Sequence, residues 1–179
     1  MPTHISPQAR SLMDQFPRIE PELLYAIAWH TFDPLELYKL DEHYRPASGT
    51  PPPAELCDSL CASTRVATRE FITRYYPSFS ALVGPLSTYF RILLALASTT
   101  PSAPTQYLAQ LVALSEEHHW SIILPYHMTF HRARMEEMAR GDYSGWEKID
   151  VELLVQLIEE REWEREQRRS PSSSCPGSR

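Results

Sequence analysis

Apolar residues recur at helical spacing over most of this chain. Leu23, Leu24 and Ile27 fall on one side of a helix, and apolar positions are denser still between residues 78 and 98. There is no sustained alternation of apolar and polar residues, and β-branched residues are sparse, so strands are not expected. The pattern therefore predicts an all-α protein, a bundle of roughly six to eight helices.

Proline-rich segments divide the predicted helices. An N-terminal helical hairpin region is expected over 1–43, in which Asp33 caps a short helix that begins with Pro34. A Pro-rich loop follows at 44–53. The main helical bundle is predicted over 54–169, and the tail at 170–179, SPSSSCPGSR, has the composition of a disordered segment.

Two prolines fall inside apolar segments that otherwise read as helices. Pro85 lies within the segment 78–98, and Pro125 lies within the stretch 118–140. Proline lacks the N–H that an interior helical residue donates, and its ring crowds the preceding turn. We therefore expect a kink or a restart at Pro85, and a helix start or a sharp kink at Leu124–Pro125.

The stretch from His118 to Asp150 mixes apolar and charged residues and holds two of the four Trp and four of the seven His. Gly141 is expected to end a helix, because glycine adopts the left-handed conformation at low cost. Asp150 is placed to cap the next helix. The structural core is predicted to include five residues of this stretch: Trp120, Tyr126, Phe130, Gly141 and Trp146.

Charge and composition limit the classes of partner. The 179 residues carry a net charge of −6, which argues against binding to nucleic acid or to an anionic membrane through this chain alone. There is no apolar run of transmembrane length and no secretory-type apolar segment at the N-terminus. Three cysteines, Cys57, Cys61 and Cys175, fit free thiols in a reducing compartment. A cytoplasmic or nuclear location is expected.

Histidines are the candidate metal ligands. His127 and His131 lie four residues apart, the spacing at which one helix face presents two imidazoles to zinc, and His118 and His119 lie nearby. Met128 occupies the position where the zincin pattern requires glutamate. The alternative is that these are partly buried histidines that hydrogen-bond to neighbouring loops, and this alternative is favoured, so no metal is assigned.

No pattern of residues predicts an active site. The five glycines are scattered and form no phosphate-binding loop, and there is no GxSxG sequence. The paired glutamates lie in charged helical segments, where adjacent residues do not face each other. We therefore expect neither catalytic residues nor a cofactor, and we predict that the protein is not an enzyme.

Residues 118–154, HHWSIILPYHMTFHRARMEEMARGDYSGWEKIDVELL, resemble a segment of gag-like proteins encoded by fungal retrotransposons. Residues 23–41 are similar to an upstream segment of the same proteins. The resemblance implies an all-α, capsid-like domain that self-associates. Two departures are Pro125 and the lack of a Cys-Cys-His-Cys zinc knuckle, and the acidic balance fits poorly with the packaging of element RNA. The matching residues are Trp120, Tyr126, His127, Phe130, His131, Arg132, Arg134, Gly141, Asp142, Tyr143, Ser144, Gly145, Trp146 and Asp150.

Three hypotheses for function follow. The first is a self-associating, gag-like structural protein. The second is a helical adaptor that binds a partner protein through Trp163, which lies in the charged and exposed C-terminal helix predicted over 159–169. The third is a metal-binding helical enzyme that uses His127 and His131.

Overall fold

A computed structural model describes residues 7–41 and 74–169. This part of the chain is all-α and contains no strand. The predicted fold class is therefore confirmed. The helices, in chain order, are α1 (Pro7–Gln15), α2 (Pro21–Ala28), the 3₁₀ helix η1 (Pro34–Leu40), α4 (Phe79–Ala95), α5 (Ala103–Glu117), α6 (Trp120–Ala139), the 3₁₀ helix η3 (Ser144–Glu147) and α7 (Val151–Arg169).

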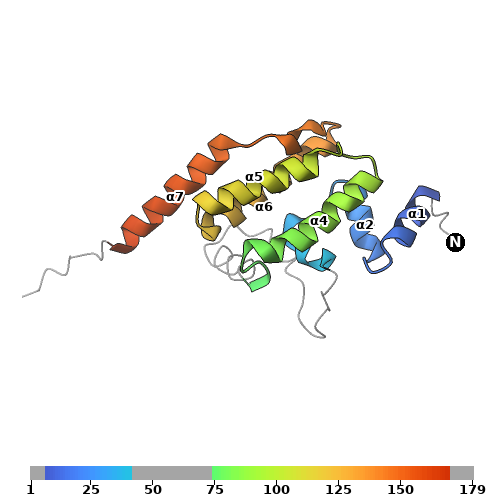
Figure 1. Ribbon diagram of the computed structural model, residues 1–179, viewed down its shortest axis with the longest axis horizontal. Coiled ribbons are helices and arrows are strands. Elements are labelled where there is room, and N and C mark those ends of the chain that lie inside the picture. Colours follow the sequence, from blue (N-terminus) through green and yellow to red (C-terminus); the bar gives the residue numbers. More distant parts are fainter. Residues whose placement is uncertain (1–6, 42–73, 170–179) are drawn as a thin grey trace, which may run out of the picture.

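The helices α4, α5 and α6 form the centre of the molecule, and the other elements pack around them (Figure 1). The 3₁₀ helix η1 packs on α4 and α6, and α2 packs on α4 and α1. The C-terminal helix α7 packs on α6, and η3 packs on α5. The helices α1 and α7 therefore lie at opposite ends of the described molecule (Figure 1).

Both interior prolines are contained in continuous helices. The helix α4 runs through Pro85, and α6 begins at Trp120 and runs through Pro125. A restart at Pro85 and a helix start at Leu124–Pro125 are therefore wrong, and the kinks expected as alternatives stay predictions. Around Pro125, the buried side chains are Ile123, Leu124, Tyr126 and His127, whereas Pro125 itself is exposed. Packing of these neighbours outweighs the hydrogen bond that proline cannot donate.

Tyr76 joins three elements. Its hydroxyl accepts a hydrogen bond from the backbone N–H of Tyr38 in η1, at 2.6 Å, and its carbonyl accepts one from the indole of Trp120, at 2.8 Å. Asp33 caps η1 as predicted, because its side chain accepts a hydrogen bond from the N–H of Leu35. The two bonds of Tyr76 thus fix η1 and α6 against the segment that leads into α4.

The connection between α6 and α7 has the helix end and the helix cap that the sequence predicts. Gly141 has φ of +87°, the left-handed conformation expected after a helix. Asp150 caps α7 by accepting a hydrogen bond from the N–H of Leu153, and its own N–H donates to the hydroxyl of Tyr126. Gly141 is exposed, so its predicted place in the core is wrong, and its role is confined to the turn.

Outside the described residues lie the predicted loop at 44–53, residues 54–73 of the predicted main bundle, and the predicted tail at 170–179. Cys57, Cys61 and Cys175 also lie outside them. Within residues 7–41 and 74–169, no helix has both the length and the apolar character needed to cross a membrane.

Candidate functional site

Trp146 lies at the centre of a buried cluster of rings. It has 0% of its surface exposed, and α4, α5 and α6 all contribute rings around it. The ring centroids of Phe90, His131 and Tyr107 lie 4.9, 5.1 and 5.2 Å from the indole. Such edge-to-face aromatic pairs stabilise a fold beyond the area they bury. The predicted core residues Tyr126 and Phe130 are buried in the same region. Trp120 is partly buried and packs against another part of the core, edge-on to Phe79.

The turn after α6 positions Trp146. Asp142 accepts hydrogen bonds from the backbone and the hydroxyl of Ser144, at 3.0 and 2.9 Å, which starts η3. Gly145 lies against Arg134, whose guanidinium donates to the Gly145 carbonyl at 3.1 Å. A Cβ at position 145 would overlap the side chains of Arg134 and Glu137. The DYSGW sequence therefore forms a tight bend that inserts Trp146 into the core.

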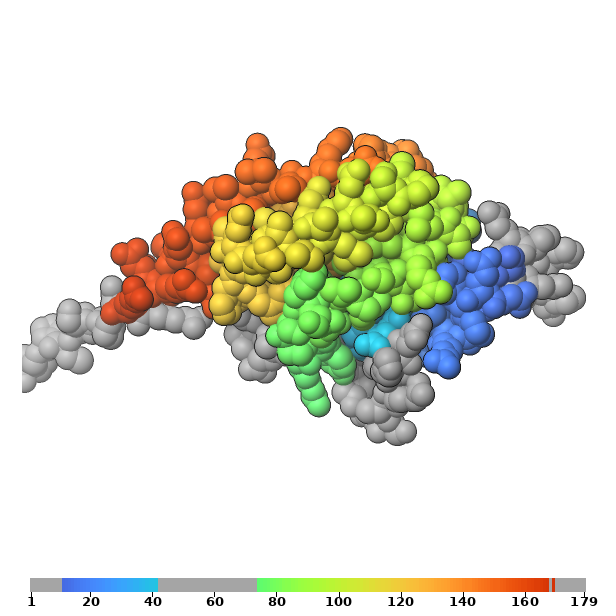
Figure 2. All heavy atoms as spheres, in the orientation of Figure 1, coloured from blue at the N-terminus to red at the C-terminus, as the bar shows by residue number. Residues whose placement is uncertain are grey.

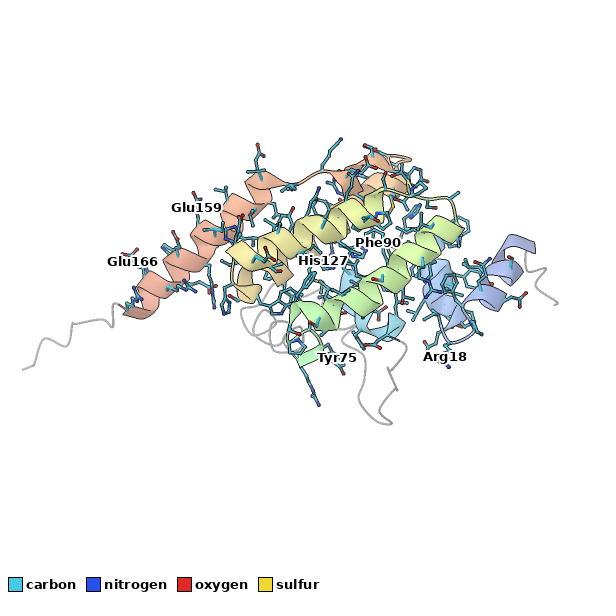
Figure 3. The ribbon with its side chains drawn as sticks, viewed as in Figure 1. Arg18, Tyr75, Phe90, His127, Glu159 and Glu166 are labelled. Atoms are coloured by element: carbon cyan, nitrogen blue, oxygen red, sulfur yellow. The ribbon has the colours of Figure 1, made fainter. Side chains whose placement is uncertain are left out.

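His127 and His131 lie inside this cluster and are fully buried. The Nδ1 atom of His127 is hydrogen-bonded to the hydroxyl of Tyr107 at 2.9 Å, and Figure 3 places His127 between α5 and α4. Within the described part of the chain, Nε2 of His127 and both ring nitrogens of His131 have no hydrogen-bond partner. Burial lowers the pKa of His127 to about 3 and lowers that of His131 well below its usual value. Both imidazoles are therefore neutral at physiological pH.

The other two candidate ligands do not complete a metal site. His118 is partly exposed and ends α5, whereas His119 is exposed and caps α6 by accepting a hydrogen bond from the N–H of Ser121. Among residues 7–41 and 74–169, no group of three or more His, Cys, Asp or Glu side chains could hold a metal ion. The described residues thus offer a pair of buried imidazoles without a third ligand.

An exposed aromatic patch lies at the end of α2. Trp29 has 75% of its surface exposed, and Tyr25 has 38%. The ring of His30, the residue after Trp29, packs edge-on against that of Tyr143, with centroids 5.7 Å apart, so the turn after α6 lies beside the end of α2. His30 has φ of +55°, in the left-handed region that non-glycine residues adopt uncommonly. We call Tyr25, Trp29, His30 and Tyr143 the aromatic patch.

The aromatic patch was not predicted from the sequence, although part of the signal was available. On a helical wheel, Tyr25 and Trp29 share a face opposite Leu23, Leu24 and Ile27. Two large aromatic residues on the polar side of a short amphipathic helix point to an exposed contact surface. The contribution of Tyr143 could not be found in this way, because it depends on the turn after α6 lying against the end of α2.

A second exposed surface lies on α7. Trp163, the predicted partner-binding residue, has 64% of its surface exposed, and Val151 and Val155 have 61% and 47% exposed. The opposite side of the helix carries the buried Leu154 and the partly buried Leu157 and packs on α6. In Figure 2, α7 extends along one end of the molecule, away from α1 and α2.

Comparisons with models of protein families, with curated proteins and with solved structures find no match for this chain. The resemblance to gag-like proteins therefore rests only on residues 118–154 and 23–41. Function has to be argued from the surfaces and the buried cluster of the molecule itself.

Proposed function

We propose that this protein is a non-enzymatic structural protein that self-associates, of the gag-like, capsid-like kind encoded by fungal retrotransposons, and that it acts in the cytoplasm or nucleus. The observation that supports self-association best is the aromatic patch, above all Trp29 with 75% of its surface exposed. Tryptophan and tyrosine are enriched in protein interfaces, and they are the residues on which binding energy concentrates.

The patch is suited to contact between identical copies. Tyr25 lies in the last turn of α2 and Trp29 is its C-cap residue, and both are exposed. Tyr143 adds a third exposed aromatic side chain from a different part of the chain. A two-fold contact would place the same rings against each other, an arrangement in which aromatic side chains pack without requiring opposite charges. Association through these rings is therefore expected to depend only weakly on salt.

Light scattering after size exclusion tests this proposal. The measured mass of the native chain should rise with protein concentration at both low and high salt. Trp29→Ala should shift the distribution towards monomer, because it removes the largest exposed ring. The matched control is Trp163→Ala, which removes an exposed tryptophan at the other end of the molecule and should leave the mass unchanged.

Two results would contradict the proposal. One is a monomer of constant mass at every concentration and salt. The other is association that Trp29→Ala leaves as strong as in the native chain. Neither result bears on the surface of α7, which the control variant probes separately.

A second candidate function is that of a helical adaptor, and the observation that favours it is exposed Trp163 on α7. The metal-binding enzyme hypothesis receives no comparable support. Its two histidines are fully buried, and the described residues supply no third ligand.

A further inference from the structure

Carboxylates surround the exposed tryptophan of α7. Residues three and four positions away are neighbours on a helix surface. For Trp163 these neighbours are Glu159, Glu160, Glu166 and Gln167, and all four side chains are exposed. Figure 3 shows Glu159 and Glu166 on α7, the helix that carries Trp163. An electron-rich ring face is therefore set among negative charges.

These carboxylates are not neutralised by their own helix. Glu159 and Glu166 have no ion pair within the described part of the chain, and Glu160 accepts a hydrogen bond from the neutral amide of Gln156 at 3.0 Å. The arginine nearest to the buried side, Arg161, pairs with Glu164 at 2.9 Å. The surface around Trp163 thus keeps its negative charge available for a partner.

The same side of α7 also offers apolar contact. Val155 lies two turns before Trp163 and has 47% of its surface exposed. Glu152 and Glu162, also exposed, extend the acidic character along the helix. A partner that fits this surface needs cationic side chains beside apolar ones.

We propose that the surface formed by Val155, Glu159, Trp163 and Glu166 docks a basic segment of another protein, with an arginine or lysine side chain stacked on the indole of Trp163. The indole face attracts a cation through its quadrupole, and the carboxylates pair with the same cation. This inference gives the adaptor hypothesis a defined partner chemistry and does not depend on self-association.

Charge argues against a second copy as the occupant. A two-fold, antiparallel contact of α7 with itself, centred on Trp163, would set Glu160 opposite Glu166 and Arg161 opposite Arg165. A parallel contact would set each glutamate opposite its own copy. Both arrangements place like charges together, which destabilises a contact. Nucleic acid and anionic lipid are opposed by the same carboxylates.

Titration calorimetry with the full chain tests the proposal. The probe is a synthetic helical peptide with one leucine face and one arginine face, and its control carries glutamate in place of each arginine. The arginine peptide should bind and the glutamate peptide should not, and the affinity should fall as salt is raised. Trp163→Ala should weaken binding of the arginine peptide by about tenfold, whereas Trp163→Phe should retain part of the affinity.

A matched pair of charge reversals separates a docking surface from net charge. Glu159→Lys with Glu166→Lys changes the surface itself, and Asp14→Lys with Glu22→Lys makes the same change in net charge on α1 and α2. The first pair should abolish binding, and the second should leave the affinity within about twofold. Equal losses from both pairs, or no loss from Trp163→Ala, would overturn the proposal. The light-scattering mass of Trp163→Ala distinguishes this failure from a failure of self-association.

Discussion

Trp146 and Trp163 show how differently this fold uses one residue type. Trp146 is fully buried among rings from three helices, and Trp163 has 64% of its surface exposed among glutamates. The first holds η3 against the bundle, whereas the second contributes little to the packing of α7. The comparison separates residues that maintain the fold from residues available to a partner, and it predicts which substitutions unfold the protein and which alter its interactions.

The largest expected effect is that of Trp146→Ala. Removing a fully buried indole leaves a cavity among Phe90, Tyr107 and His131, and such substitutions cost about 3–5 kcal/mol. Urea denaturation followed by circular dichroism should show this loss in the free energy of unfolding. A loss below about 1 kcal/mol would mean that Trp146 is not the centre of the cluster.

Acid should destabilise the protein through the same cluster. The unfolded chain binds protons at His127 and His131 near their ordinary pKa of about 6.5, whereas burial lowers both pKa values in the folded state, that of His127 to about 3. Above about pH 6.5 both histidines are neutral in the folded and the unfolded protein, and the full free energy of unfolding is present. As pH falls from about 6.5 towards 3, the unfolded chain takes up protons that the folded protein does not, so the free energy of unfolding falls by up to about 1.4 kcal/mol per pH unit for each histidine. Unfolding free energies measured between pH 7 and 5 check this slope. A variant with both histidines replaced by leucine should show a shallower dependence.

The two histidines should respond in opposite ways to substitution by leucine. His131→Leu removes two ring nitrogens that have no partner among the described residues, so the free energy of unfolding should stay the same or rise by about 1–2 kcal/mol. His127→Leu leaves the hydroxyl of Tyr107 without its partner and should cost about 1–3 kcal/mol. Thermal and urea denaturation of both variants make the comparison. If His131→Leu proved the more damaging, the imidazole of His131 would have a polar role that its present contacts do not account for.

The smallest effect on stability is expected for Trp163→Ala. Because the ring is largely exposed, the free energy of unfolding should change by less than about 0.5 kcal/mol. The same urea denaturation used for Trp146→Ala provides a direct comparison. A loss of about 2 kcal/mol or more would show that Trp163 supports the fold, and would weaken its assignment to a partner surface.

The sequence predicted features that depend on local backbone chemistry. Asp33 and Asp150 were identifiable as helix caps, and Gly141 as a left-handed helix end, because each effect acts within a few residues. The helix start predicted at Pro125 was wrong, because buried neighbours on both sides keep α6 continuous. Local rules alone do not decide between a broken and a continuous helix when tertiary packing favours continuity.

Features formed by distant segments were not predicted. The aromatic patch requires α2 and the turn after α6 to lie side by side, as the His30–Tyr143 ring contact shows. The complete burial of His127 and His131 likewise depends on rings from α4, α5 and η3. The four-residue spacing of the two histidines suggested metal ligands, but it carried no information about the aromatic surroundings that make both imidazoles neutral.

Sedimentation equilibrium of the native chain and of Trp29→Ala, at matched concentrations, tests the central claim most directly. That claim is that the protein acts through exposed aromatic surfaces that its fold does not need. The native chain should show a mass that increases with concentration, and Trp29→Ala should remain closer to monomer with an unchanged free energy of unfolding. Equal masses for the two proteins at every concentration would contradict the claim.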